Sequence, residues 1–177
     1  MFHSTTILAV KRHNNLVFSG DGQVTIGNSI AKSNANKLRR LDNGNILAGF
    51  AGSTADSFML FDMFEKKIKE FSGQFIRSCV ELAKDWRSDK ILKKLEALLL
   101  VGNKEKILLV SGLGDVLEPD ENVYAIGSGG LIAYSCAKSL LENTELNARL
   151  IAEKSMKIAS SLCIYTNSNI KYEEIFW

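Results

Sequence analysis

The stretch NILAGFAGSTADSFMLFDMFEKKIKEF, residues 45–71, changes within a few residues from a strand pattern to a helix pattern. Its first part, 45–52, is almost entirely apolar, and Asn43-Gly44 before it is a strong hairpin signal. Ser53 is a favourable N-cap residue, and after it apolar residues recur at helical spacing. The stretch therefore predicts a buried strand followed by a helix with one apolar face, made of Phe58, Phe61, Phe64, Ile68 and Phe71.

Outward from this stretch, runs of strands alternate with pairs of helices. Strands are predicted at 5–11, 15–20, 23–30, 97–102, 106–112 and 123–127. Helices are predicted at 75–99, with a break near Arg87-Ser88, and at 130–142 and 146–163. Single crossover helices between strands would indicate a parallel sheet, and that pattern is missing. The order predicts an α+β protein, a four-layer αββα sandwich with antiparallel sheets between two helix layers.

Length and composition favour one soluble domain. The chain has 177 residues, 46% of them hydrophobic and 24% charged, and its net charge is +2. Such a charge gives no general electrostatic case for binding nucleic acid or an anionic membrane. The apolar run at 95–101 is far shorter than the ~18 residues that a membrane span needs. The N-terminus lacks the pattern of a secretory signal, so we predict a cytoplasmic protein.

Cysteine and histidine offer little for catalysis or for metal binding. Cys79, Cys136 and Cys163 are far apart in the sequence and are expected to pack as small apolar residues. The two histidines, His3 and His13, are placed neither for a zinc site nor for a Ser-His-Asp triad. Acid–base chemistry in this protein must therefore use a group other than imidazole.

The N-terminal sequence MFHSTTILAV, residues 1–10, suggests such a group. A threonine at the very N-terminus of a chain has its own α-amine as a base, with an ordinary pKa of about 7.7–8.0. Residues 1–4 would have to be removed first, because an amide nitrogen is not a base. The alternative is that Thr5 and Thr6 are only two β-formers at the start of a strand.

Several longer motifs resemble one family. They are GDGQVTIGNSIAKSNANKLRRL (20–41), AGFAGSTADSFMLFDMFE (48–65), ELAKDWRSDKILKKLEALLLV (81–101), AIGSGG (125–130), LLENTELNARLIAEK (140–154) and CIYTN (163–167). In this order and spacing they resemble the HslV (ClpQ) peptidases, the proteasome-related members of the N-terminal nucleophile (Ntn) hydrolases. The resemblance extends from Thr5 to about Asn167. It implies the Ntn-hydrolase sandwich and a threonine-type endopeptidase.

The resemblance implies a role for three of the candidate residues. Thr5 matches the mature N-terminal threonine, so residues 1–4 would be a propeptide and 5–177 a single peptidase domain, with Thr6 structural. Asp21 and Lys37 match the acidic and basic residues beside the nucleophile. A lysine ammonium there would favour the alkoxide, and the aspartate would orient it. Without the resemblance, Asp21 would be read as a turn residue and Lys37 as a surface charge.

Two further catalytic positions follow from the same resemblance. Gly49 matches a backbone N–H donor of the oxyanion hole, although a strand glycine can also serve only close packing. Ser128 matches a serine beside the threonine amine that relays protons. Taken alone, GSGG at 127–130 could bind phosphate at a helix N-terminus, but the lysine of a P-loop is missing. Lys32 and Arg39 are expected to be supporting residues of the same basic stretch.

The resemblance also implies a cation site, and it implies no organic cofactor. The expected ligands are main-chain oxygens of Ser160, Cys163 and Thr166, which suit a monovalent cation such as Na⁺ or a divalent one. The family often has glycine at the first position, and this chain has Ser160. A backbone ligand survives that exchange if the φ and ψ angles suit an L-residue.

The family also implies partners. It forms a double ring of hexamers around an inner chamber, and the ring ATPase HslU unfolds protein substrates, hydrolyses the ATP and activates the peptidase allosterically. The alternative function is a non-catalytic structural ring subunit of the same fold. Thr5, Asp21, Lys37 and Ser128 together favour the active peptidase, since a structural subunit has no chemical need for all four.

Overall fold

The structure, a computed structural model, describes residues 5–52, 54–90 and 97–177. The predicted N-cap at Ser53 and the predicted propeptide at 1–4 lie outside these residues. Within the described part of the chain, no helix combines the length and the apolar character that a membrane span requires.

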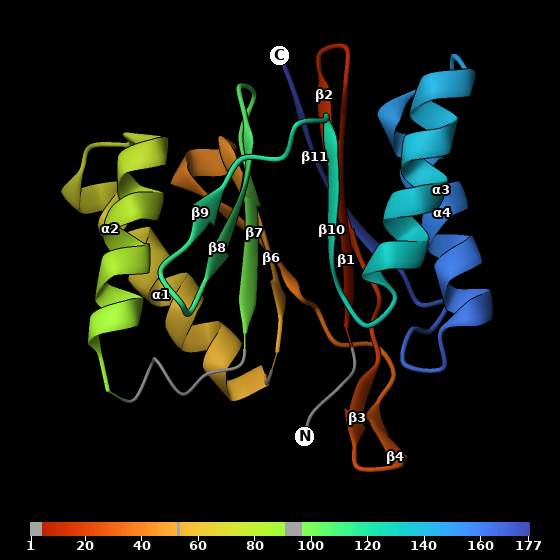
Figure 1. The fold of residues 1–177 in the computed structure, drawn as a ribbon, viewed down its shortest axis with the longest axis horizontal. Coiled ribbons are helices and arrows are strands. Elements are labelled where there is room, and N and C mark those ends of the chain that lie inside the picture. Colours follow the sequence, from red (N-terminus) through yellow and green to blue (C-terminus); the bar gives the residue numbers. More distant parts are fainter. Residues whose placement is uncertain (1–4, 53, 91–96) are drawn as a thin grey trace.

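Two antiparallel sheets lie face to face in the middle of the molecule, and a small hairpin extends from one end (Figure 1). The four-stranded sheet has the order β10-β1-β2-β11, with β1 Thr6–Arg12, β2 Asn15–Gly20, β10 Val123–Gly127 and β11 Lys171–Phe176. The five-stranded sheet has the order β5 to β9, with β5 Leu38–Leu41, β6 Ile46–Ala51, β7 Leu98–Gly102, β8 Ile107–Ser111 and β9 Val116–Leu117. The hairpin consists of β3 Val24–Ile26 and β4 Ser29–Lys32.

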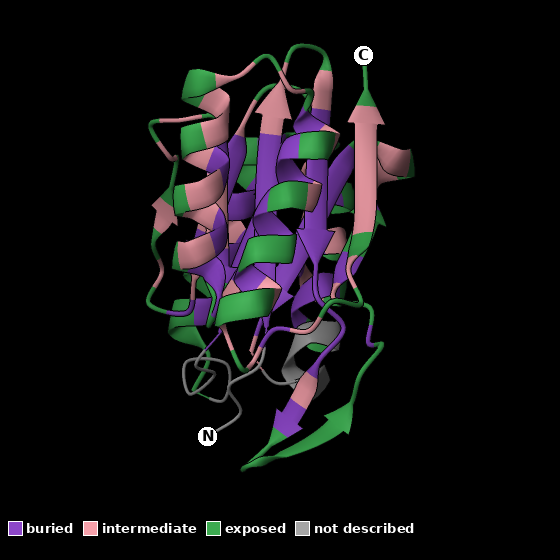
Figure 2. Cartoon of the chain, turned by 90° about the vertical axis from the view of Figure 1, so that its right-hand side faces the viewer, coloured by how far each residue is buried: buried purple, intermediate pink, exposed green. Residues whose placement is uncertain are grey.

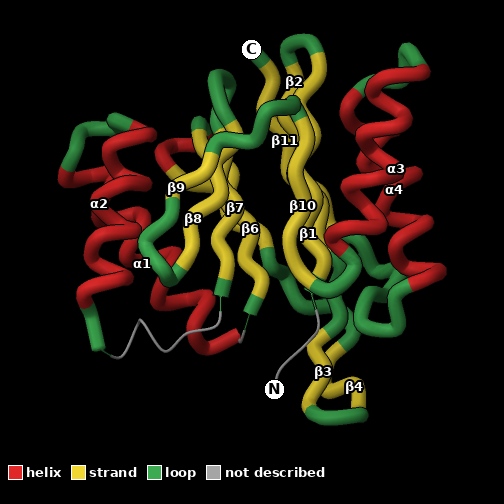
Figure 3. The backbone as a smooth tube through the Cα atoms, in the orientation of Figure 1, coloured by secondary structure: helices red, strands yellow, loops and turns green. Residues whose placement is uncertain are grey.

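A pair of helices covers the outer face of each sheet (Figures 1 and 3). Helices α1 (Thr54–Glu70) and α2 (Phe75–Ser88) pack on the five-stranded sheet. Helices α3 (Gly130–Asn143) and α4 (Ala148–Leu162) pack on the four-stranded sheet. A 3-10 turn, η1 (Asp42–Gly44), joins β5 to β6 where Asn43-Gly44 predicted a hairpin. The predicted αββα sandwich is confirmed.

Three apolar clusters lie between the two helix layers and the two sheets and hold them together. The layer beneath α1 and α2 contains Phe64, Ile68 and Trp86, and the layer beneath α3 and α4 contains Ile151 and Met156. Between the sheets, strand residues of both pack directly on one another, including Ile7, Phe18, Leu47 and Leu100. Figure 2 shows the inner strands buried and the β3–β4 hairpin exposed along β4.

The apolar face predicted for α1 is present where the side chains are described. Phe61, Phe64 and Ile68 are buried. Phe71 lies just after the helix and is only partly buried, with the Arg77 guanidinium 4.4 Å from its ring centre. The Phe58 side chain lies outside the described residues.

The structure differs from the predicted elements at several places. The predicted strand at 23–30 is a hairpin, since the chain turns at Gly27 with a φ of 57°. Helix α2 ends at Ser88, at the break predicted near Arg87-Ser88. Of the part predicted to continue to residue 99, residues 91–96 lie outside the described residues, and Leu98 and Leu99 belong to β7. Three strands, β5, β9 and β11, were not predicted at all. In β5, LRRL, the ends are buried and the middle is exposed, so the two-residue alternation of a strand is missing.

The topology gathers loop residues at one end of the four-stranded sheet. Strand β1 is antiparallel to both β2 and β10, so its first residue lies beside the last residues of those strands. Thr6 pairs with Gly127, and Ile7 pairs with Gly20. Thr5, Asp21 and Ser128, which immediately flank these strands, therefore meet at that end.

Candidate active site

Thr5 is held at the start of β1 by Ser128. The Ser128 N–H donates to the Thr5 carbonyl oxygen at 2.8 Å, and the Ser128 hydroxyl donates to the same oxygen at 3.3 Å. The Thr5 backbone nitrogen lies 3.5 Å from Ser128 Oγ. Thr5 is buried, with 4% of its surface exposed, whereas Ser128 is exposed. The predicted contact between the serine and the threonine nitrogen is therefore present in the geometry.

The glycines around Ser128 make room for Thr5 and Thr6. Gly127 has a φ of 91°, and a Cβ added to it would lie 1.9 Å from the Thr5 carbonyl oxygen. A Cβ on Gly129 would lie 2.4 Å from Thr6 Oγ1. The GSGG segment thus serves the chain's own N-terminal strand, and this explains its glycines without a phosphate ligand.

Asp21 is a fully buried carboxylate with four donors. Its Oδ1 accepts the Thr6 N–H at 2.8 Å and the Lys37 ammonium at 2.9 Å. Its Oδ2 accepts the N–H groups of Gln23 at 2.9 Å and Asn167 at 3.4 Å. Asp21 also donates its own N–H to the Thr6 carbonyl at 3.2 Å. These bonds compensate the desolvation of the charge and fix the carboxylate against the first residues of β1.

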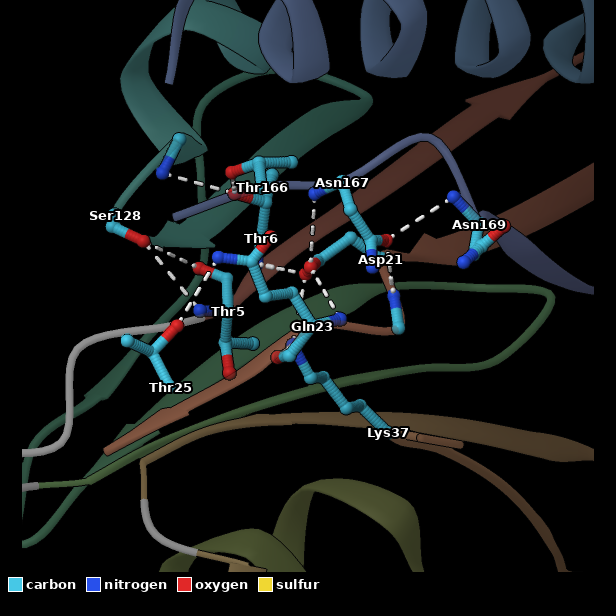
Figure 4. A network of polar contacts seen from close by, with 12 residues as sticks. Thr5, Thr6, Asp21, Gln23, Thr25, Lys37, Ser128, Thr166, Asn167 and Asn169 are labelled. Carbon is cyan, nitrogen blue, oxygen red and sulfur yellow. Dashed lines mark hydrogen bonds and ion pairs between the residues drawn. The ribbon is translucent and has the colours of Figure 1, made fainter. Parts of the chain in front are cut away.

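Lys37 is the buried cation of the site. It precedes β5, and its ammonium donates to Asp21 and, at 2.5 Å, to the Gln23 carbonyl. Its side chain is 10% exposed. Burial lowers the pKa of Lys37 below its ordinary value of 10.5, and the charge and the hydrogen bond of Asp21 oppose part of that shift. Figure 4 shows Asp21, Lys37 and Ser128 converging on the Thr5-Thr6 segment.

A loop that follows α4 closes the back of this site. The Asn167 side chain accepts the Gly22 N–H at 3.2 Å and donates to the Ser33 carbonyl at 2.8 Å. Thr166 is buried, and its hydroxyl lies 2.7 Å from Thr6 Oγ1. Sequence reasoning assigned no side-chain role to Thr6, Thr166 or Asn167. The motif CIYTN was the available signal, because it places two polar residues in the loop that follows a helix.

The other predicted residues lie in different surroundings. Gly49 is buried in the middle of β6, paired with Leu38 and Leu100, and a Cβ added to it would lie 2.5 Å from Ile7 Cγ2. Close packing between the sheets is therefore sufficient to explain this glycine. Lys32 is exposed on β4, and the Arg39 guanidinium lies 5.8 Å from the ring centre of Phe61.

The predicted cation ligands lie around the end of α4. The helix ends at Leu162, so the Ser160 carbonyl belongs to the last turn, where helix carbonyls lack amide partners within the helix. The Cys163 carbonyl accepts the Thr166 N–H at 3.0 Å and keeps a second lone pair. These neutral oxygens fit the preference of a hard cation for oxygen ligands. Within residues 5–52, 54–90 and 97–177, no group of three or more His, Cys, Asp or Glu residues is placed to hold a metal.

The three cysteines are free thiols. Cys79 is fully buried, and burial raises its pKa to about 12. Cys136 and Cys163 are partly buried. The expectation that the cysteines pack as small buried apolar residues therefore holds for Cys79, whereas Cys136 and Cys163 keep part of their surface exposed.

Comparison with known proteins shows the family to which this chain belongs. Residues 1–175 match the family model described as "Proteasome subunit". The ATP-dependent protease subunit HslV of Pseudothermotoga lettingae is 55% identical over 172 residues, which cover 97% of this chain and 98% of the relative.

Solved structures of known proteins have the same fold as this chain. A eukaryotic HslV from Trypanosoma brucei superposes with a TM-score of 0.92 at 42% identity, over 97% of this chain and 99% of that one. The BPH protein of Thiobacillus denitrificans, at 17% identity over 97% of each chain, has a TM-score of 0.74 and supports the fold alone. The chain belongs to the HslV proteins of the proteasome family and is the proteolytic subunit, a threonine peptidase, of an ATP-dependent protease.

Proposed function

We propose that Thr5 is the nucleophile of this peptidase after removal of residues 1–4. The observation that carries the proposal is that three functional side chains from different parts of the chain meet at the Thr5-Thr6 segment. Asp21, Lys37 and Ser128 all converge on Thr5 and Thr6, either directly or through a single carboxylate oxygen. The new α-amine of Thr5 would accept the hydroxyl proton while Oγ attacks the substrate carbonyl. The peptide amine then leaves with a proton, and water hydrolyses the resulting ester.

Asp21 and Lys37 act in this proposal as a charged pair beside the nucleophile. The ammonium favours the developing alkoxide, and its lowered pKa makes it a stronger proton donor than an exposed lysine. The carboxylate holds the lysine and the Thr6 backbone in one arrangement. Ser128 would relay protons at the Thr5 nitrogen, 3.5 Å from its hydroxyl. The oxyanion role of Gly49 stays a prediction.

A cation at the end of α4 is part of the proposal. The carbonyl oxygens of Ser160, Cys163 and Thr166 would hold Na⁺ or a divalent ion, which would stabilise the turn between α4 and Asn167. No organic cofactor is proposed, and ATP would be used by the partner alone.

The proposed assembly is a cytoplasmic double ring of hexamers that receives unfolded proteins from an HslU-type ATPase and is activated allosterically by it. The names of the relatives support an ATP-dependent complex. Exposed apolar side chains at one end of the α3–α4 layer, Leu131, Leu162 and Ile164, support packing between subunits.

The test of the nucleophile is the intact mass of the purified protein together with two substitutions. Loss of residues 1–4 and abolished peptidase activity in Thr5→Ala are the expected results. Thr5→Ser is the matched control, since it keeps a hydroxyl and should retain activity. Each variant is assayed with the ATPase partner, and ring assembly is followed by gel filtration. A stable full-length N-terminus on an active enzyme, or activity in Thr5→Ala, would refute the assignment.

A further inference from the structure

The Thr6 side chain is part of a buried hydroxyl network rather than a simple strand contact. Thr6 is fully buried, and Thr166 is 3% exposed. Thr6 Oγ1 accepts the Gly129 N–H at 2.9 Å and lies 2.7 Å from Thr166 Oγ1. The Thr6 oxygen has two lone pairs and one proton, so it accepts from Gly129 and still forms a hydrogen bond with Thr166 in which either hydroxyl can be the donor. Residues about 120 and 160 positions away in the sequence thus meet on one oxygen atom.

This network gives the hydroxyl a function that β-propensity does not explain. Valine has the same branched shape and would suit a strand equally well. Valine would, however, leave a buried N–H and a buried hydroxyl without their partner, and unmade buried hydrogen bonds are costly. Gly129 is also the N-cap of α3, and no side chain of its own caps the helix. The Thr6 hydroxyl, on strand β1, thus accepts a hydrogen bond from the backbone N–H at the start of α3.

The same contact orients Ser128. Two consecutive amides donate to two consecutive residues of the N-terminal strand: the Ser128 N–H to the Thr5 carbonyl and the Gly129 N–H to Thr6 Oγ1. Together they fix the peptide units on both sides of Ser128, and hence the direction from which Ser128 Oγ meets Thr5. If the second bond is lost, the peptide unit that follows Ser128 is no longer tied to Thr6, and the contacts of Ser128 with Thr5 remain.

We propose that Thr6 is a positioning residue for the threonine chemistry, acting through Gly129 on Ser128 and anchored by the Thr166 hydroxyl. The inference rests on the proposed function of Thr5 and Ser128. Thr6 is buried beneath the site and does not touch substrate, so its loss affects the catalytic step and leaves substrate binding unchanged.

The experiment compares Thr6→Val with Thr6→Ser in a fluorogenic peptide assay with the ATPase partner at saturation. Activity is expressed per processed subunit, counted by intact mass. Thr6→Val should remove residues 1–4 more slowly, or lower kcat by about 10- to 100-fold, because small displacements of catalytic groups have effects of this order. KM should stay unchanged. Thr6→Ser keeps the oxygen and should restore kcat to within about threefold of the wild type. Wild-type processing and kcat in an assembled Thr6→Val ring would overturn the proposal, as would a loss that Thr6→Ser does not restore.

A second variant decides the question if Thr6→Val does not assemble. Thr166→Val keeps the bond from Gly129 to Thr6 and removes only the anchoring hydroxyl, so a smaller loss of kcat, about threefold or more, is expected at unchanged KM. Wild-type kcat in Thr166→Val would then overturn the proposal. These experiments distinguish failure of the Thr6 proposal from failure of the Thr5 proposal. An inactive Thr5→Ala with a fully active Thr6→Val would refute the role of Thr6 alone. Activity in Thr5→Ala would refute the underlying function.

Discussion

Replacing Gly127 with alanine tests whether Thr5 is held by the glycine-rich loop after β10. Gly127 has a φ of 91°, and its missing Cβ would lie 1.9 Å from the Thr5 carbonyl oxygen and 2.7 Å from its carbon. Both are backbone atoms, so a rotamer change does not relieve the overlap. Gly44 is the matched control. It has a φ of 95°, but an added Cβ would meet only the flexible Arg40 side chain, at 3.5 Å or more.

The structure sets the size of the difference between these two variants. An L-residue at positive φ costs about 1–2 kcal/mol at either position. At Gly127 the overlap adds about 1–3 kcal/mol. Loss of the hydrogen bond from the Ser128 N–H to Thr5 adds about 0.5–1.5 kcal/mol. Gly127→Ala should therefore be less stable than Gly44→Ala by about 1.5–4.5 kcal/mol, which lowers Tm by at least roughly 3–6 °C for a chain of this size.

Thermal unfolding and the peptidase assay check the two consequences separately. Gly44→Ala should assemble, lose its N-terminal residues and keep its activity. Gly127→Ala should melt at a lower temperature and lose about 100-fold or more of its kcat, because Thr5 itself must move. Equal Tm values and equal activities for the two alanine variants would refute the reasoning that the loop positions Thr5.

Two further predictions concern buried titratable groups. Because burial lowers the pKa of Lys37, the unfolded chain binds more protons than the folded protein between that lowered value and 10.5. The contribution of Lys37 to the free energy of unfolding should rise with pH in this window, and Lys37→Met should remove the rise in urea titrations. An unchanged pH slope would contradict the desolvation of this ammonium. The Cys79 thiol, with a pKa of about 12, should resist iodoacetamide at pH 8 in the folded protein and react after unfolding, as followed by peptide mass spectrometry. Rapid labelling in the folded protein would show that α2 opens.

Elements with strong local signals were predictable from the sequence. The strand at 123–127 has its predicted bounds, and α3 and α4 differ from prediction by one or two residues at their ends. Strand β11, KYEEIF, carries charges along an edge position and is recognised only through its pairing with β2. The chain at 23–30 looked like one strand because its turn depends on Gly27 at positive φ, which the apolar pattern does not indicate.

In the candidate site, too, some residues were predictable from local sequence and others were recognised only in the tertiary structure. Thr5, Asp21, Lys37 and Ser128 were found from motifs, and the structure brings all four to one end of the four-stranded sheet. The hydroxyl pair of Thr6 and Thr166 was not found, because no local pattern links residues 160 positions apart.

By itself, the sequence determined the alternation of strands with helix pairs, since hydrophobic spacing is a property of neighbouring residues. It also determined that histidine is not available where catalysis would need it. Only the tertiary structure decided that Asp21 has four donors, that Lys37 is desolvated and that Thr6 shares its oxygen with Gly129 and Thr166. Burial and hydrogen-bond partners depend on which strand ends meet, and antiparallel pairing of distant segments sets that.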